Sequence, residues 1–254
     1  MSGFRAYCDL SEISKTCGIK AGLELRLDNS ESRHLCGSLR AKDGDVVDVF
    51  DLENNVARCT ILDASQKSTL LKVQEILTPS IPQTQIYIAQ SIPKGNAFEE
   101  ILSGSVEIGA SGIYPLISQR TTVKIEKNDA ERKRQKWIAK SVEAVKQSAN
   151  LSPYSIELPQ RFDSFINCAS STFDVKLVAS LRTNAKPILK VLQDNFTQAQ
   201  YKRLCILIGP EGDFSPEEYD LAESVGFLPV KLGDNVMRSD TAALCALSIT
   251  RAFF

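Results

Sequence analysis

The C-terminal part of the chain, residues 204–254, constrains the fold more than any other segment. An apolar run at 204–208 leads into a glycine-rich turn at 209–212, and a second apolar run at 228–232 leads into a loop that ends near Arg238. Short apolar runs bounded by turns and helices are typical of buried strands in a parallel sheet. Ligands of such sheets bind outside the carboxyl ends of the strands, so the two loops are predicted to form one pocket rim.

Two helices are predicted within the same segment. Ser215 and Glu218 match a capping box with a proline at the first helical position, so a helix should begin there. Residues 241–254 are apolar on most faces of a helix, and Ser239 or Asp240 is expected to cap it. A helix that is apolar all round lies in a core or in an oligomer interface, and we expect a homodimer interface here.

The first part of the chain is rich in short strand-like runs. They are separated by turn residues and interrupted by one short helix at 30–40, which Ser30 is expected to open. Short strands at this spacing suggest a small barrel. The runs are residues 4–8, 22–28, 45–51, 55–63 and 68–76.

Farther along the chain, strands alternate with helices. Helices are expected at 96–109 and 129–150. This alternation implies an α/β domain with a mostly parallel sheet. We therefore expect a barrel domain at 1–76, a linker at 77–83 and an α/β domain at 84–254. The strands of the second domain are expected at 86–92, 113–117, 175–180, 204–208 and 228–232.

Composition excludes several classes of function. The formal net charge is −1, so a nucleic-acid partner would be bound by local patches rather than by overall charge. With the single histidine at His34, a His-ligated zinc site or a Ser-His-Asp triad cannot be built in the C-terminal part. Seven widely spaced cysteines without a CxxC pair favour free thiols in a reducing cytosol. No signal-peptide core and no apolar run of ~18 residues is present, so we expect a cytoplasmic protein without metal or membrane contact.

Two features of the pocket rim have more than one interpretation. The turn at 209–212 either lets the backbone approach a ligand closely or serves only the geometry of a strand-to-helix connection. It is neither a P-loop nor a GxGxxG fingerprint. Arg238 is either a functional cation or a surface residue that pairs with Asp240.

Other polar segments are candidates for contact with a ligand or with RNA. Between residues 120 and 146 there are nine Lys or Arg against four Asp or Glu, and Trp137 lies among them. Cations beside an aromatic ring suit a phosphate backbone with stacked bases, but a solvated helix face with Trp137 packed beneath it has the same pattern. Lys94, in a Pro-Lys-Gly turn, is placed to meet a phosphate, and Gln147 and Ser148 offer neutral hydrogen-bonding groups. The alternative for these three is ordinary loop and helix-end chemistry.

Together these motifs resemble the RsmE family, the 16S rRNA uridine-N3 methyltransferases of the SPOUT class. The order and spacing of the motifs are more specific than any one of them. The matching residues run through nearly the whole chain and include Arg33-His34-Leu35, Lys42-Asp43-Gly44-Asp45, Pro93-Lys94-Gly95, Glu107-Ile108-Gly109-Ala110, Gln147-Ser148, Gly209-Pro210-Glu211-Gly212, Leu232-Gly233 and Arg238 with Thr241-Ala242-Ala243-Leu244.

The resemblance implies an α/β fold, namely a SPOUT-type parallel sheet with a C-terminal trefoil knot, preceded by a small PUA-like β-barrel domain that binds RNA. Such knots are rare exceptions to unknotted chain topology. It also implies a homodimer with S-adenosylmethionine (SAM) held in the knot, largely by backbone groups. Carried onto this chain, the cofactor-binding residues are Ser180, Leu181, Ile208, Gly209, Pro210, Glu211, Gly212, Leu232, Gly233, Val236, Met237, Arg238, Thr241 and Ala242.

The implied activity is methylation of N3 of a uridine in 16S rRNA or the small ribosomal subunit. Negative charge would spread onto O2 and O4 as N3 loses its proton, and a cation aimed there would lower the barrier. Arg238 is the first candidate for this role, with Gln147 and Ser148 as positioning groups. The residues expected to hold RNA are Arg5, Arg33, His34, Arg40, Lys94, Arg120, Arg132, Lys133, Arg134 and Lys136.

The chain departs from the family pattern at three places. Asp213 stands where a second glycine is usual, Ser239-Asp240 replaces Thr-Glu, and Asn150 replaces an arginine. The change at Asn150 bears on substrate contact rather than on SAM. Two other functions are alternatives: a non-catalytic ribosome-assembly or RNA-binding factor that keeps the fold, and a nucleotide-binding α/β enzyme unrelated to methylation, which the absence of both phosphate-loop patterns disfavours.

Overall fold

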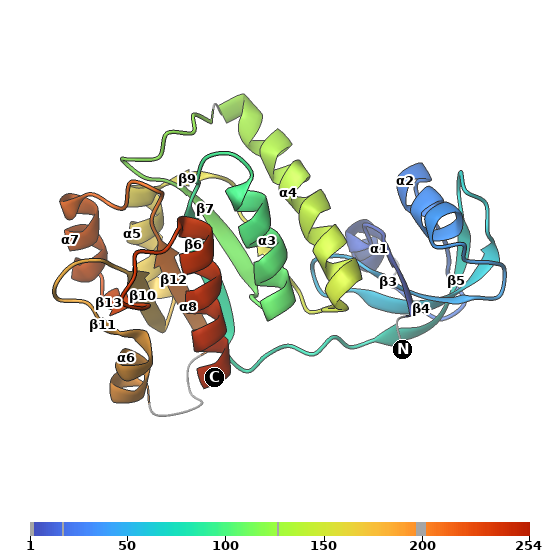
Figure 1. Ribbon diagram of the computed structural model, residues 1–254. Helices are drawn as coiled ribbons and strands as arrows, with labels where there is room; N and C mark the ends of the chain where they lie inside the picture. Colours follow the sequence, from blue (N-terminus) through green and yellow to red (C-terminus); the bar gives the residue numbers. More distant parts are fainter. Residues whose placement is uncertain (1–2, 17, 126, 197–201) are drawn as a thin grey trace. The chain divides into compact units, whose positions relative to one another are not determined.

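The computed structural model describes residues 3–16, 18–125, 127–196 and 202–254 (Figure 1). Contacts within the chain divide it into two units. The first unit comprises residues 1–81 together with 151–153, and the second comprises 82–150 together with 154–254. Among the described residues, no helix combines the length and the apolarity that crossing a membrane requires.

The first unit is built on a five-stranded sheet with the strand order β1-β3-β4-β5-β2. Strands β1 and β3 are parallel, and the other neighbours are antiparallel. All five strands expected from the sequence are present. The elements are β1 (Phe4–Tyr7), α1 (Ser11–Thr16), β2 (Glu24–Arg26), α2 (Asn29–Ser32), the π-helix η1 (Arg33–Ser38), β3 (Val46–Phe50), β4 (Val56–Asp63) and β5 (Leu70–Leu77).

The helical segment of this unit differs from the expectation at its start and in its form. Asp28, not Ser30, caps it, because the Asp28 carboxylate accepts a hydrogen bond from Glu31 N at 2.8 Å. The expected single helix is a short α-helix that continues into the π-helix. Leu35 and Cys36 on the π-helix are buried in the core of the sheet, with Val47, Val49, Cys59 and Leu71 among its other members.

The second unit contains six helices and eight strands among its described residues, and all strands belong to one sheet. The elements are β6 (Gln85–Ser91), α3 (Ala97–Ile108), β7 (Gly112–Ile117), α4 (Lys127–Ser148), β8 (Ser155–Ile156), β9 (Gln160–Arg161), α5 (Phe162–Thr172), β10 (Val175–Ala179), β11 (Lys186–Pro187), α6 (Ile188–Asn195), β12 (Arg203–Ile208), α7 (Pro216–Ser224), β13 (Leu228–Lys231) and α8 (Ser239–Phe253).

The order of strands shows that the chain returns twice into the middle of the sheet. The order is β11-β13-β10-β12-β6-β7-β8, with β9 paired to β7, and each of these pairings is parallel. Strand β12 therefore lies between β6 and β10, and β13 lies between β10 and β11. A parallel α/β sheet is what the resemblance predicts for this unit, and the trefoil knot itself stays a prediction of the resemblance.

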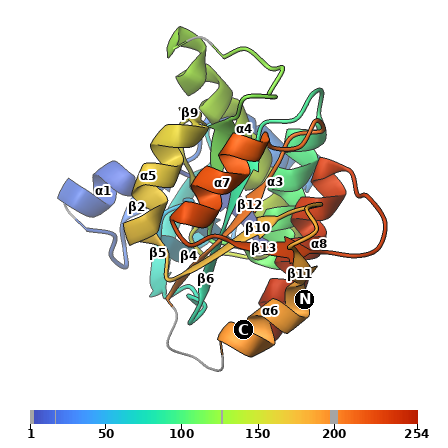
Figure 2. The same ribbon diagram turned by 90° about the vertical axis from the view of Figure 1, so that its left-hand side faces the viewer.

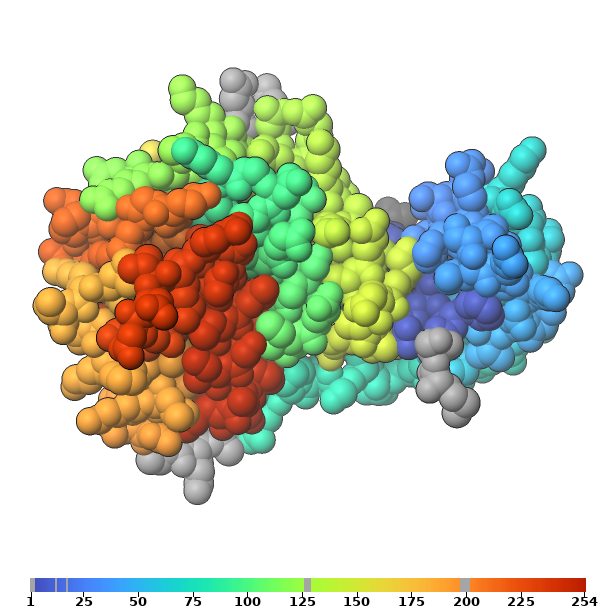
Figure 3. All heavy atoms as spheres, in the orientation of Figure 1, coloured from blue at the N-terminus to red at the C-terminus, as the bar shows by residue number. Residues whose placement is uncertain are grey.

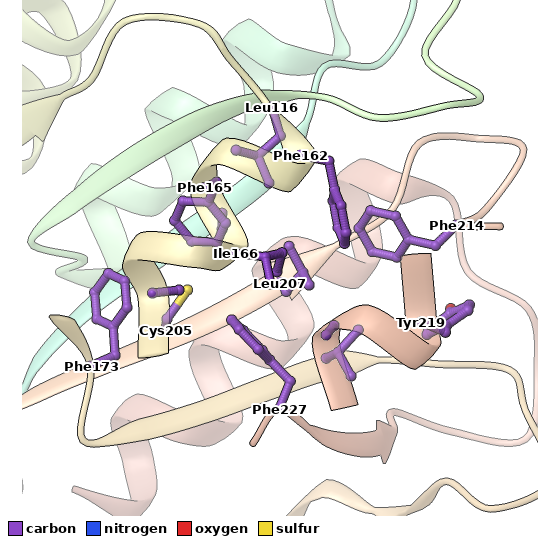
Figure 4. Close-up of a cluster of buried hydrophobic side chains, with 14 of the residues drawn as sticks. Leu116, Phe162, Phe165, Ile166, Phe173, Cys205, Leu207, Phe214, Tyr219 and Phe227 are labelled. Carbon is purple, nitrogen blue, oxygen red and sulfur yellow. The ribbon is translucent and has the colours of Figure 1, made fainter. Parts of the chain in front are cut away.

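Helices cover both faces of this sheet (Figure 2). Alternate residues of β12 point to opposite faces: Cys205 and Leu207 join the aromatic cluster under α5 and α7, with Phe165, Phe173 and Phe227 (Figure 4). The other face is covered by α3 and α8, which contact β7, β6 and β12. Burial on both faces explains why the sequence of β12 is continuously apolar.

Helices α3 and α8 lie side by side on one face of the second unit (Figure 3). Gly104 permits their close approach, because a Cβ there would lie 2.7 Å from Leu244 Cδ2. Arg251 near the end of α8 donates hydrogen bonds to Gly109 O at 2.6 Å and to Thr84 O at 3.0 Å. These contacts fix α8 along its length and so determine where its first residues lie.

Candidate functional site

A cavity of about 350 Å³ lies at the carboxyl ends of three neighbouring strands, β13, β10 and β12. Parallel strands deliver their following loops to one edge of the sheet, so three segments that are distant in sequence meet there. The lining residues are Ala179, Ser180, Leu181, Ile208, Gly209, Pro210, Glu211, Asp213, Val230, Lys231, Leu232, Gly233, Asn235, Val236, Met237, Arg238, Ser239 and Ala242.

Most of the predicted cofactor residues are among those that line the cavity. Two are not. Gly212 lies against the side chain of Arg120, and Thr241 is exposed on the first turn of α8. Six further residues line the cavity and were not in the predicted set: Ala179, Asp213, Val230, Lys231, Asn235 and Ser239. Each lies one or two positions from a predicted residue, and this was the available signal for them.

Buried polar groups join the loop after β12 to the start of α8. Ser239 Oγ donates a hydrogen bond to Gly209 O at 2.6 Å and accepts one from Gln90 Nε2 at 2.9 Å. Gln90 is fully buried at the end of β6 and also donates to the Ser91 carbonyl oxygen at 2.7 Å. These hydrogen bonds hold the loops after β12 and β13 together. They can form because β6, which carries Gln90, lies next to β12 in the sheet.

Further side-chain hydrogen bonds hold the turn that follows β12. Glu211 Oε1 accepts a hydrogen bond from the backbone nitrogen of Lys94 at 2.8 Å, and Arg120 Nη1 donates one to Gly212 O at 2.8 Å. The predicted capping box at the start of α7 is confirmed, with Ser215 and Glu218 bonded reciprocally. Glu218 also accepts from Gln119 N at 2.7 Å. The loops after β6, β7 and β12 are therefore connected.

The expected cap of α8 is wrong. The N-cap residue is Arg238, and its side chain makes no capping hydrogen bond. The Ser239 hydroxyl is instead engaged by Gly209 O and Gln90, and Asp240 accepts from Thr241 N at 2.9 Å from within the helix.

Arg238 combines features of both interpretations that the sequence left open. Its Nη2 donates to Asp240 Oδ2 at 2.9 Å, and the residue lines the cavity. The Arg238 side chain is 79% exposed. Its guanidinium has five N–H donors, and the contact with Asp240 leaves most of them for a ligand or substrate at the mouth.

Gln147 and Ser148 are not brought to this cavity within one chain. Helices α3, α4 and α8 all begin at the cavity end of the sheet (Figure 1), and α4 runs away from it. The two residues form the last turn of α4, next to the end of α3, where Asn150 Nδ2 donates to Val106 O at 2.8 Å. Their catalytic role was predicted from the family resemblance and not from their spacing relative to Arg238 in the sequence.

The predicted RNA-binding residues of the first unit belong to its sheet edge and its helical segment. Arg5 is half-buried on β1, and His34 is half-buried on η1. Arg33 is exposed and donates to Asn29 Oδ1 at 2.9 Å. Arg40 is exposed just after η1, with a left-handed backbone at φ 58°.

The predicted RNA-binding residues of the second unit lie in two places. Lys94 and Arg120 are exposed beside the turn after β12, where Arg120 also supports the backbone. The others, Arg132, Lys133, Arg134 and Lys136, lie on the first half of α4.

Two contacts of the α4 cations, one to another segment and one within the helix, weaken the case for the whole basic cluster. Arg134 Nε donates to Ile156 O at 2.7 Å, and Arg132 pairs with Asp129 at 2.7 Å. Trp137 is 6% exposed, and its ring lies 4.4 Å from that of Phe98. Trp137 therefore packs beneath the helix and is not available for stacking on a base.

Comparison with known proteins agrees with the fold. Residues 79–251 match the family model of the RNA methyltransferase domain, and residues 27–74 match that of the RNA methyltransferase PUA domain. Ribosomal RNA small subunit methyltransferase E of Synechocystis sp. is 30% identical over 224 residues, which are 87% of this chain and 71% of the relative. The protein of the same name in Bacillus subtilis is 26% identical over 229 residues, which are 87% of each chain.

Solved structures extend the similarity to three dimensions. The structure of a methyltransferase from Legionella pneumophila, in complex with the bound cofactor SAM, is 27% identical with a TM-score of 0.84, and the match covers 99% of this chain and 98% of that chain. The fold and the family models together define an RNA methyltransferase with a PUA domain. More particularly, the chain belongs to the RsmE family of ribosomal RNA methyltransferases.

Replacement of Ser239 by alanine should destabilise the protein. The substitution removes the closer of two donors to Gly209 O and one of the partners of Gln90 in a buried place, which costs about 1–3 kcal/mol. Urea unfolding of Ser239→Ala measures this. Ser248→Ala is the matched control on the same helix, because Ser248 is exposed and its hydroxyl donates to Leu244 O, one turn earlier in the helix. Equal midpoints for the two variants would contradict the role given to Ser239.

Proposed function

We propose that this protein binds SAM in the three-loop cavity and methylates N3 of a uridine in 16S rRNA of the small ribosomal subunit. The observation that carries the proposal is the convergence of the loops after β10, β12 and β13 on one cavity, in a chain of the RsmE family. When bound, SAM supplies an electrophilic methyl group, so the protein has mainly to hold and orient two reactants.

The chemistry of the cavity fits such a cofactor. Its volume of about 350 Å³ lies within the usual range of small-molecule sites, about 300–1,000 Å³. Leu181, Val236 and Met237 provide apolar surface for a purine. Two carboxylates, Glu211 and Asp213, and two cations, Lys231 and Arg238, line it as well. This balance suits a ligand that carries both charges, and it does not suit a polyphosphate, which needs an excess of cations.

Arg238 is the residue that we assign to the target base. N3 of uridine carries a proton at neutral pH, and negative charge develops on O2 and O4 as that proton leaves. A guanidinium held at the mouth by Asp240 can donate to one of these oxygens. The exposure of Arg238 favours contact with a large substrate that arrives from outside.

The RNA itself would be held by backbone contacts from both units. Lys94 and Arg120 flank the cavity, and Arg33 and Arg40 offer exposed cations on the PUA domain. Such contacts position the RNA without reading its sequence. The net charge of −1 makes these local cations the source of affinity.

A homodimer would reconcile Gln147 and Ser148 with the same reaction. They lie at the opposite end of the sheet from Arg238 within one chain, so they can serve its substrate only from a second copy. Helix α8 leaves Ile249 and Phe253 half-buried, which provides apolar surface for such a copy.

SAM titration and an RNA assay test the proposal directly. We expect the purified chain to bind SAM in calorimetry and to transfer a labelled methyl group to small-subunit RNA. Mass spectrometry of rRNA from a deletion strain should then show the loss of one N3-methyluridine. SAM binding without methyl transfer to any small-subunit substrate would favour a non-catalytic assembly factor, and no binding at millimolar SAM would refute the proposal.

Replacement of Arg238 by alanine should reduce methyl transfer by about 10²–10³-fold, the usual effect of removing one donor to a developing oxyanion. RNA affinity should change little, because many other cations contact the backbone. Single-turnover methylation and filter binding measure the two quantities. Asp240→Asn is the companion variant: it keeps Arg238 but weakens its anchor, so a smaller loss is expected. An unchanged rate in Arg238→Ala would show that the assignment is wrong.

A mixing experiment tests whether two copies build one site. The variant Arg238→Ala and the double variant Gln147→Ala/Ser148→Ala should each be inactive alone. When they are co-expressed, half of the dimers are mixed and each mixed dimer keeps one intact site, so about a quarter of the wild-type rate should return. Activity that stays at the level of the separate variants would contradict sharing between copies, and full activity of the double variant would remove both residues from the reaction.

A further inference from the structure

The loop after β12 contains a carboxylate that the family pattern does not predict. Asp213 takes the place of a glycine and keeps a left-handed backbone, with φ 62°. Aspartate tolerates this conformation better than most residues do. Asp213 N donates to Pro210 O at 2.9 Å, which closes the turn. The half-buried Asp213 lines the cavity.

One oxygen of this carboxylate is held firmly. Asp213 Oδ1 accepts from Tyr219 Oη at 2.6 Å and from Phe214 N at 2.8 Å. Burial, together with the hydrogen bond to Asp213, raises the pKa of Tyr219, so the phenol stays protonated and donates. Tyr219 Oη also lies 3.2 Å from Ala179 O, at the end of β10. The carboxylate is therefore fixed at the cavity wall between the ends of β10 and β12.

The other oxygen is available. Within the described part of the chain, Asp213 Oδ2 has neither a hydrogen-bond nor an ion-pair partner. Arg182 lies 5.6 Å from the centroid of the Tyr219 ring, but its guanidinium pairs with Asp220 and Glu223. Glu211, the other carboxylate of the cavity, differs because it is exposed and accepts from Lys94 N.

We propose that Asp213 forms a subsite for a positively charged group of the cofactor, a feature of this chain that a glycine at the same place cannot supply. A partly buried carboxylate with one fixed and one free oxygen attracts a cation more strongly than a solvated one does. The inference rests on the proposed function, because SAM carries two such groups, its sulfonium and its amino group.

Calorimetry on the full chain with three ligands tests the subsite. The ligands are SAM, sinefungin, which has an amino group in place of the sulfonium, and S-adenosylhomocysteine, which lacks the sulfonium charge. Asp213→Asn keeps the left-handed tolerance and the acceptor for Tyr219 but removes the charge. We expect it to weaken SAM binding by about tenfold or more.

Comparison of the three affinities shows which positively charged group of SAM lies against Asp213. If Asp213 faces the sulfonium, affinity for SAM and sinefungin falls and affinity for S-adenosylhomocysteine does not. If it faces the amino group, affinity for all three falls alike. Tyr219→Phe keeps the charge but frees the carboxylate, so an intermediate loss is expected. Asp213→Gly, which suits φ 62° without strain, should match Asp213→Asn and serves if that variant does not fold.

Asp63→Asn is the charge-matched control. Asp63 is exposed at the end of β4 in the first unit and does not line the cavity, so its substitution should leave all three affinities unchanged. Equal losses in Asp213→Asn and Asp63→Asn would mean that only overall charge matters. Wild-type affinities retained in Asp213→Asn and Asp213→Gly would overturn the subsite while leaving the proposed function intact. A wild-type chain that binds none of the ligands would overturn both.

Discussion

The burial of β12 between β6 and β10 is the constraint on which the rest of the second unit depends. From Leu204 to Ile208 its residues are 2% exposed or less, because helices cover the sheet on both sides and a strand lies along each edge of β12. A strand in this position can end only between the loops of its two neighbours. The turn that begins at Gly209 is therefore delivered to the middle of the carboxyl edge, and the location of the cavity follows from strand order before any side chain is considered.

Side chains then convert this location into a defined site. Ser239, the first residue of α8, and Gln90 both donate to the carbonyl oxygen of Gly209, and Gln90 also donates to Ser239. Hydrogen bonds of Glu211 and Arg120 connect the same turn to the loops after β6 and β7. A cofactor site that is built largely from backbone needs such hydrogen bonds. Without them the loops would be less ordered in the free protein, and ordering them on binding would cost free energy. Because backbone groups form most of the site, few side chains of this chain are candidates for a catalytic role.

The elements that the sequence predicts well are those with a long, regular pattern. The apolar run at 204–208 could be assigned because both of its faces are buried, and the start of α7 could be assigned because Ser215 and Glu218 interact locally. The cap of α8 could not. Ser239 is a favourable capping residue by local rules, but its hydroxyl is engaged by Gly209 O, thirty residues earlier in the chain. The two-residue strands β8, β9 and β11 exist only through pairing with β7 and β13, and no local pattern specifies them.

The site shows the same division between local and tertiary information. Sequence comparison with a family pattern can mark Asp213 only as a departure, since its effect depends on Tyr219, six residues later on α7. The fold supplies the reason why this departure is tolerated. A glycine is replaced by one of the few residue types that accept a left-handed backbone, and one oxygen of the new carboxylate is satisfied by Tyr219 and Phe214. These two hydrogen bonds lower the free-energy cost of burying the charge, and Asp213 lines a cavity whose proposed ligand carries positive charge.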